Sequence, residues 1–138
     1  MLHLAIFSPG VIKRIFNGQK TIDGRFSKIK CAPYGLVQEG DLILMKKSGG
    51  KTKGYFVAGR VDYYNDLPAK KLQLIIDRYW DKLAIDNNFW DKKKNSSYFT
   101  FIEIKRPTKF RVPVNIKKKN LSGWLVLGGQ SQNQIQLF

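Results

Sequence analysis

The sequence contains almost none of the residues used for metal or thiol chemistry. Its 138 residues include one cysteine, Cys31, and one histidine, His3. A single cysteine allows no intramolecular disulfide and suits a reducing compartment such as the cytoplasm. One histidine and one cysteine argue against a protein-only zinc site and against a Ser-His-Asp or Cys-His catalytic machine. We therefore expect no metal and no cofactor.

Long hydrophobic runs are also missing. No apolar stretch approaches the roughly 20 residues that span a bilayer, and the first ten residues lack the basic region and apolar core of a signal peptide. Hydrophobic residues make up 43% of the chain and aromatic residues 13%, which is typical of a globular protein. We expect one domain over residues 1–128 and a polar tail over 129–138, in a cytoplasmic protein without a membrane partner.

Acidic residues are scarce, since 25 Lys and Arg face 10 Asp and Glu and leave a net charge of +15. The surplus is uneven: residues 1–61 carry +8, residues 62–91 carry −2 and residues 92–138 carry +9. A basic surface attracts polyanions through its long-range field and through counterion release. Compositional bias toward lysine is the alternative reading, but the clustering of acidic residues in the middle favours a polyanionic partner.

Hydrophobic patterning predicts a small β-rich domain with inserted helices. Leu72, Ile75, Ile76, Tyr79, Trp80 and Leu83 follow helical spacing after Pro68. Alternation, turn residues and cap signals predict the remaining elements. We expect strands at 2–7, 41–47, 55–64, 97–106, 110–116 and in the closing GWLVLGG run, and helices at 9–17, 68–83 and 86–92, with Ser8 capping the first helix and Pro9 at its first position. Inserted rather than alternating helices argue for an α+β fold, a small mixed β-barrel capped by helices.

The stretch GQKTIDGRFSK places Lys20, Asp23, Arg25 and Lys28 within nine residues, after the expected end of the first helix. In extended chain Asp23 and Arg25 point to one face and can pair. An arginine fork beside a carboxylate can read a phosphate or a base edge, and Lys20 adds a point charge. Alternatively, the pair only holds a turn and Lys20 is solvated. A binding role predicts that Arg25→Ala weakens binding without changing the melting temperature; a turn role predicts the opposite.

The segments NGQKTIDGRFSK, CAPYG, GDLILMKKSGG and GYFVAGRV together resemble the ASCH domain, the activating signal cointegrator homology module of the PUA-like superfamily. The resemblance covers residues 1 to about 61 best. It implies a PUA-like barrel with a cleft between the first helix and the barrel. In such proteins the cleft is thought to receive RNA or nucleotide-like ligands.

Further candidate contacts come from glycine-rich, basic and aromatic segments. Ser48 and Lys46 belong to the KKSGGKTKG hairpin, which is either a ligand contact or a solvated tip. The rings of Trp90 and Trp124 could stack a base or belong to the core. The Lys runs at 92–94 and 117–119 suit phosphate contacts that do not depend on the nucleotide sequence. The predicted ligand-binding set is Lys20, Thr21, Asp23, Arg25, Lys28, Lys46, Ser48, Trp90, Lys117 and Trp124.

Two functions of different classes remain open. The first is a nucleic-acid-binding module, with RNA as partner and a nucleotide in the cleft. The second is a small hydrolase, amidohydrolase-like or nuclease-like, acting on a nucleoside or RNA. Some compact ASCH-like proteins are acetylcytidine amidohydrolases that use a Lys, a Thr three residues later and a distant Glu. Lys20 matches the Lys and Asp86 is the counterpart of the Glu, but Asp23 replaces the hydroxyl, so we prefer binding.

A protein-interaction adapter is a third reading that the charge does not favour. Oligomeric state stays open.

Overall fold

The computed structural model describes residues 1–117 and 122–128, so the expected tail at 129–138 and two residues of the 117–119 lysine run lie outside the described residues. Within that part of the chain no helix is long and apolar enough to cross a membrane. The elements follow in the order β1 (Leu2–Phe7), α1 (Val11–Phe16), β2 (Ile22–Ser27), β3 (Leu42–Lys47), β4 (Thr52–Asn65), α2 (Ala69–Leu83), α3 (Asn87–Lys93), β5 (Tyr98–Val114) and β6 (Trp124–Gly128).

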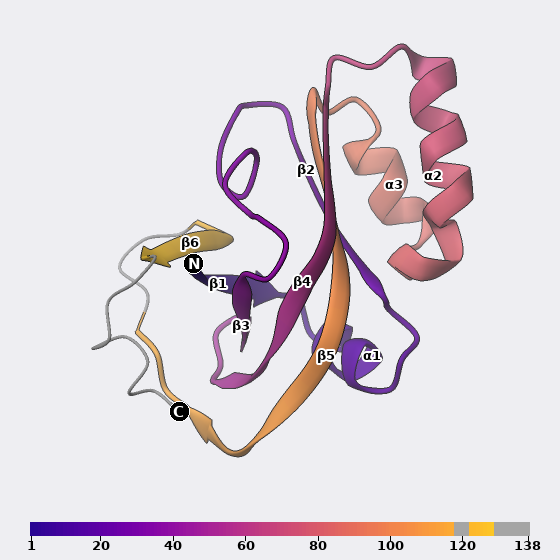
Figure 1. Ribbon diagram of the computed structural model, residues 1–138. Coiled ribbons are helices and arrows are strands. Elements are labelled where there is room, and N and C mark those ends of the chain that lie inside the picture. The colour runs from indigo at the N-terminus through magenta and orange to yellow at the C-terminus, as the bar shows by residue number, and fades with distance from the viewer. Residues whose placement is uncertain (118–121, 129–138) are drawn as a thin grey trace.

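The strands form one curled sheet with the order β2-β5-β4-β3-β1-β6 (Figure 1). The pair β1 and β3 is parallel, and the other described pairs are antiparallel. The long strands β4 and β5 cross the middle of the molecule, with α2 and α3 to one side and β1, β3 and β6 to the other. The structure therefore confirms the predicted mixed α+β fold and the β3–β4 hairpin, and the predicted barrel is a curled, six-stranded half-barrel.

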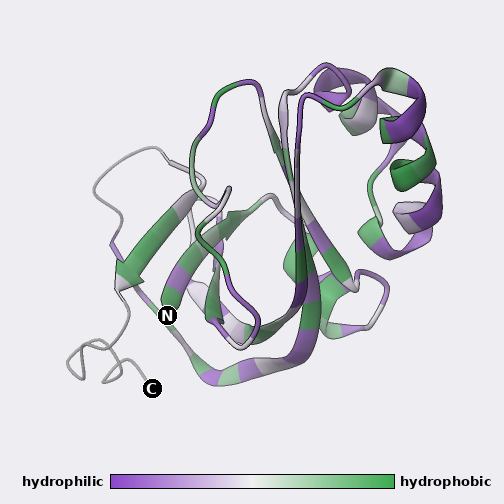
Figure 2. Ribbon diagram, turned by 45° about the horizontal axis from the view of Figure 1, so that its top comes forward, coloured by the Kyte–Doolittle hydropathy of each residue, from purple (hydrophilic) through white to green (hydrophobic). Residues whose placement is uncertain are grey.

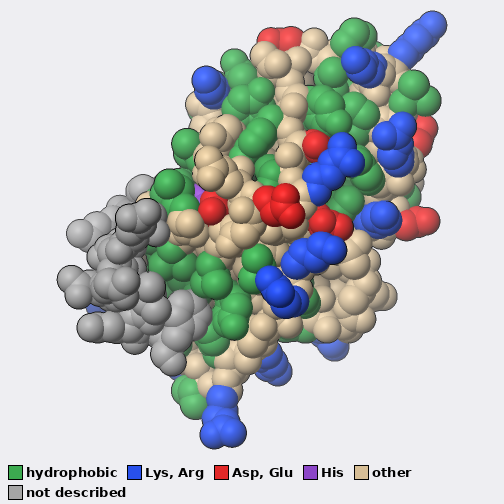
Figure 3. Space-filling view, viewed as in Figure 1, with side chains coloured by type: hydrophobic (Ala, Val, Ile, Leu, Met, Phe, Trp, Pro, Cys, Tyr) green, Lys and Arg blue, Asp and Glu red, His purple; other side chains and the backbone are tan. Residues whose placement is uncertain are grey.

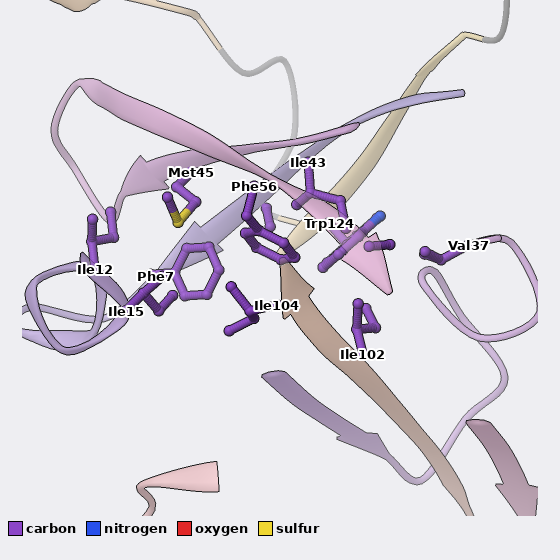
Figure 4. Packing of buried hydrophobic residues seen from close by; sticks show 12 residues of the cluster. Phe7, Ile12, Ile15, Val37, Ile43, Met45, Phe56, Ile102, Ile104 and Trp124 are labelled. Atoms are coloured by element: carbon purple, nitrogen blue, oxygen red, sulfur yellow. The ribbon is translucent and has the colours of Figure 1, made fainter. Parts of the chain in front are cut away.

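Two main hydrophobic clusters hold the helices to the sheet. Inside the curl, α1 contributes Ile12 and Ile15, which pack among Phe7, Phe56 and Trp124 from the strands (Figure 4). The second cluster lies between the amphipathic α2–α3 pair and the β2–β5 end of the sheet. It contains Ile22, Phe26, Leu72, Ile75, Ile76, Leu83, Trp90, Phe99 and Phe101. The α2 ribbon accordingly carries both hydrophobic and hydrophilic segments, as Figure 2 shows. The predicted helix stripe is confirmed.

The start of the first helix differs from the prediction. α1 begins at Val11, and no side chain caps it. Gly10 adopts a left-handed φ of 85°, and the Val11 amide donates to the Ser8 carbonyl at 3.2 Å. Ser8 to Val11 therefore form a turn, so Pro9 lies before the helix rather than at its first position. Asp86 behaves as a true N-cap: its carboxylate accepts from the Phe89 amide at 2.7 Å and starts α3.

The two predicted strands at 97–106 and 110–116 are a single strand, β5. Pro107 and Pro113 of this strand lie beyond Glu103, where the pairing of β5 with β2 ends. From there β5 pairs with β4 only, so one of its edges needs no backbone donor. Arg106 takes a positive φ of 48° beside a register shift, which lets the strand bend without ending.

Gly54 allows α1 to lie close to β4 and β5. A Cβ at Gly54 would lie 2.2 Å from the Thr108 carbonyl oxygen and 2.9 Å from the Phe16 ring, both far inside normal contact. We expect Gly54→Ala to lower the free energy of unfolding by about 3 kcal/mol, measured by urea denaturation. Gly40→Ala is the control, because Gly40 has φ 91° but open space around it; backbone strain alone costs about 1 kcal/mol there. An equal or smaller loss at Gly54 would contradict the close approach.

Candidate functional site

A cleft of about 980 Å³ opens between α1, β2, the loop that follows β2 and the connection from α2 to α3. Its lining divides by chemistry. Arg14 of α1, Lys20, Asp23 and Arg25 form a charged group, and Asp86 and Lys93 add one charge of each sign in the α2–α3 region. Residues from the loop after β2 and from the α2–α3 region are mostly apolar, including Ile29, Pro33, Tyr34, Ile85 and Phe89. Strand β2 runs between the two parts and contributes to both.

Lys20 is buried at the charged end of the cleft, with 5% of its surface exposed. Its ammonium donates to the carbonyl of Leu83, at the C-terminal end of α2, where helix carbonyls have no partner within the helix and the helix dipole favours a cation. Gly24 makes this contact possible, because a Cβ there would lie 3.0 Å from the Leu83 side chain and 2.7 Å from the Phe26 ring. The end of α2 thus lies directly on β2.

The pKa of Lys20 lies below its ordinary value. The main cause is burial, which removes water from the ammonium. The nearby carboxylate of Asp23 opposes this shift, and the positive charges of Arg25 and Arg14 add to it. Lys20 therefore lies within the field of three other charged groups of the cleft.

Asp23 and Arg25 form the ion pair expected from their spacing. Arg25 Nε donates to Asp23 Oδ2 at 2.9 Å, and Asp23 is 3% exposed. Both residues lie on β2, opposite Ile102 and Thr100 of β5, so the antiparallel register holds the pair on one face of the sheet. A buried carboxylate that accepts a charge-assisted hydrogen bond is firmly positioned.

The Arg25 guanidinium lies against two aromatic rings of the core. Its carbon is 4.7 Å from the centroid of Phe7 and 5.1 Å from that of Trp124. The Trp124 indole in turn donates to His3 Nδ1 at 3.1 Å, so Nε2 carries the proton in neutral His3 and donates to Asp41 at 2.8 Å. Arg25 is therefore a packing residue as well as a cleft residue. Arg25→Ala should lower the melting temperature, contrary to the sequence-based expectation for a binding role.

Arg14 is a cleft residue that sequence reasoning missed. It lines the charged end, and its Nε is buried without a hydrogen-bond partner. Val11, three residues earlier on the same helix face, also lines the cleft. The i, i+3 spacing of Val11 and Arg14 was the available signal. It becomes informative only when the face of α1 that borders the cleft is known. The apolar side chains from the loop after β2 and from the α2–α3 region, the apolar wall of the cleft, were missed for the same reason. Ile29 (69% exposed) and Phe89 (36% exposed) come to the same cleft only in the folded chain.

The structure brings five of the predicted site residues to this cleft: Lys20, Asp23, Arg25, Asp86 and Trp124. The remaining six do not line it: Thr21, Lys28, Lys46, Ser48, Trp90 and Lys117. Among the residues of the described ranges, no group of three or more His, Cys, Asp or Glu side chains is placed to hold a metal ion.

Several of these six have evident structural contacts. The Lys46 ammonium donates to the Gly50 carbonyl at 2.6 Å within its own hairpin. The Ser48 amide donates to the Phe7 carbonyl at 2.9 Å. Trp90 packs edge-on against Phe26 at 5.9 Å and borders a second depression beneath α2 and α3. Their roles in ligand binding stay predictions.

The charge on the outer face of the long strands is mixed. Arg60 pairs with Asp62 at 2.9 Å, and Lys105 pairs with Glu103 at 3.5 Å. Figure 3 shows acidic and basic side chains next to one another in the centre of this view. The excess positive charge of the chain therefore does not form one uninterrupted patch on this face. In the cleft, by contrast, several cations lie near one buried carboxylate.

The sequence matches no protein-family model, and no curated protein matches it. Its structure, however, is similar to the crystal structure of ASCH from Zymomonas mobilis, with a TM-score of 0.74, 13% identity, and coverage of 99% of this chain and 92% of that one. Structures of two mutants of that protein give the same score and identity. A protein described as hypothetical matches 78% of this chain and all of its own, with 18% identity and a TM-score of 0.53. The fold is therefore that of an ASCH structure, as the motifs predicted.

The lowered pKa of Lys20 should make stability depend on pH. Between this pKa and the ordinary lysine value, the unfolded chain holds a proton that the folded chain releases, so stability rises with pH. We expect the free energy of unfolding of the wild type, relative to Lys20→Met, to increase as the pH rises toward the ordinary lysine pKa of 10.5 in urea titrations. Exposed Lys13→Met should show no such trend. A difference between wild type and Lys20→Met that stays flat with pH would contradict the burial of a charged Lys20.

Proposed function

We propose that this protein is an ASCH-like, nucleic-acid-binding module that holds one nucleotide of an RNA chain in the cleft. The observation that carries the proposal is the uneven lining of the cleft, with several cations around Asp23 at one end and mostly apolar and aromatic side chains, beside Asp86 and Lys93, at the other. A nucleotide has a similar division, an anionic phosphate and a flat aromatic base whose faces can stack on rings. The cleft volume of about 980 Å³ is at the upper end of the range for small-ligand sites.

The apolar end suits an unstacked base. Phe89 is partly exposed at the cleft, and Tyr34 is held in place by edge-on contacts with Tyr63 at 5.2 Å and Tyr98 at 5.0 Å. Rings that are already fixed lose little entropy when a base stacks on them. Proteins that read RNA mostly bind single-stranded segments, whose bases are free to enter such a pocket. The net charge of +15 would draw the chain toward RNA.

The exposed lysines have a separate part in this proposal. Lys28 and Lys117 lie on the surface outside the cleft. Contacts of such residues with phosphates would supply affinity without sequence preference, and binding would weaken steeply with salt through counterion release. Discrimination between nucleotides would come from the cleft.

The test uses short single-stranded RNA and fluorescence anisotropy at two salt concentrations. We expect Arg25→Gln to weaken binding at least about tenfold, because the variant loses a cation at the cleft and loosens Asp23. Arg106→Gln is the matched control, since Arg106 is an exposed arginine of β5 outside the cleft; it should change affinity less than about threefold. Melting curves show the folded fraction of each variant, so that lost packing at Arg25 is not mistaken for lost binding.

Three results would overturn the proposal. Arg25→Gln and Arg106→Gln could weaken RNA binding equally, which would mean that surface charge alone binds RNA. The affinity could be independent of salt, which would remove the polyanion argument. The wild-type protein could also fail to bind RNA at low salt.

Hydrolysis is the second candidate function, and the environment of Lys20 favours it. A lysine whose pKa is lowered by burial is closer to the neutral form that a general base requires. Asp23 is near enough to influence its charge, and Asp86 also lines the cleft. Against this, the Lys20 ammonium is engaged by the Leu83 carbonyl, and Asp23 is tied to Arg25.

We expect little or no deacylation when the wild type is incubated with a panel of N-acylated nucleosides and products are followed by liquid chromatography. The reason is that Asp23 stands where a hydroxyl would be needed. Lys20→Met serves as the background control. Turnover by the wild type that disappears in Lys20→Met would replace binding with hydrolysis as the function of the cleft.

A further inference from the structure

Arg14 is a cation at the charged end of the cleft whose own interactions are incomplete. No described carboxylate pairs with it, whereas the one buried carboxylate of the charged end, Asp23, is taken by Arg25. Its Nε is buried without an acceptor, which normally costs free energy. Its charge is the smallest of the causes that lower the pKa of Lys20, so the two cations repel each other. An anion bound between them would relieve all three penalties.

The backbone around Arg14 fixes it at this end of the cleft. The Lys20 amide donates to the Arg14 carbonyl at 3.0 Å, so the chain returns from α1 directly past it. A Cβ placed at Gly10 would lie 3.4 Å from the guanidinium, so the arginine head lies against the turn that precedes α1. Ser8 from the same turn also lines the cleft. Arg14, Lys20 and this turn therefore share one corner.

We propose that this corner is a phosphate subsite in which Arg14 and Lys20 bind the phosphate of a nucleotide. The inference rests on the proposed nucleotide-binding function and narrows it, because it makes the ligand a phosphorylated nucleotide and not a nucleoside. Strand β2 rises roughly 3.3 Å per residue, so about 13 Å separate the level of Asp23 from that of Ser27, where the apolar wall begins. A phosphate bound in the corner lets the sugar and base of the same nucleotide extend along β2 toward that wall.

The first arm of the test compares ligands and needs no variant. The four nucleoside 5′-monophosphates, the four matching nucleosides and inorganic phosphate are titrated into the wild type by isothermal calorimetry at constant ionic strength. We expect each monophosphate to bind at least tenfold more tightly than its nucleoside, and inorganic phosphate to compete with it. Equal affinity for a nucleoside and its monophosphate would overturn the subsite.

The second arm assigns the phosphate to Arg14. Arg14→Gln should weaken monophosphate binding at least tenfold and leave nucleoside binding unchanged, while Arg14→Lys, which keeps the charge, should retain part of the affinity. Lys13→Gln is the matched control: it removes the same charge from the adjacent, exposed position of α1 outside the cleft. It should change affinity less than twofold. An equal loss in Arg14→Gln and Lys13→Gln, or a loss that includes nucleosides, would overturn the role of Arg14.

The outcomes separate this inference from the proposed function. If RNA binds in an Arg25-dependent manner but monophosphates gain nothing over nucleosides, the phosphate subsite is wrong and the nucleotide cleft stands. If RNA, nucleosides, monophosphates and inorganic phosphate all fail to bind, both proposals are wrong. If Arg14→Gln does not fold, the ligand comparison on the wild type and the Arg14→Lys titration still decide the matter.

Discussion

The contact between the buried Lys20 ammonium and the Leu83 carbonyl is the constraint on which the cleft depends. It joins the chain leaving α1 to the end of α2, two elements that are distant in sequence. A buried ammonium needs an acceptor because its desolvation is costly. The carbonyl at the end of a helix supplies one, and its negative dipole adds to the attraction. The contact therefore fixes the end of α2, which the second hydrophobic cluster holds to the sheet, beside the first cleft cation, and the Thr21 amide supports it by donating to the Lys82 carbonyl at 2.9 Å.

The same end of the cleft concentrates charge that the fold only partly compensates. Arg14, Lys20 and Arg25 surround the single carboxylate of Asp23. Like charges held close together repel one another, so the cluster lowers the free energy of unfolding. Local costs of this kind are typical of binding sites, where a ligand completes the interactions.

Arg25 links this cluster to the interior of the half-barrel. Its guanidinium lies on Phe7 and Trp124, and Trp124 is held by His3, which in turn contacts Asp41. A residue in this position is both a cleft residue and part of the core, so its substitution affects binding and stability together. From the sequence alone, a binding role and a structural role were alternatives, but Arg25 has both kinds of contact. For Arg14, whose Nε has no partner among the described residues, the two roles stay separate.

The local pattern of the sequence determined most of the elements and the Asp23–Arg25 pair. Apolar periodicity placed α2, and the i, i+2 spacing on an extended strand set the ion pair, because these depend on residues close in the chain. Its motifs also indicated the ASCH-like fold. Only the tertiary structure decided that β5 continues past its prolines, since this required an unpaired edge beyond β2. It alone brought Arg14, Ile29 and Phe89 to one cleft and took Lys46 and Trp90 elsewhere. Those outcomes depend on how α1, the loop after β2 and α3 pack against the sheet, and packing between distant segments leaves no periodic mark on the sequence.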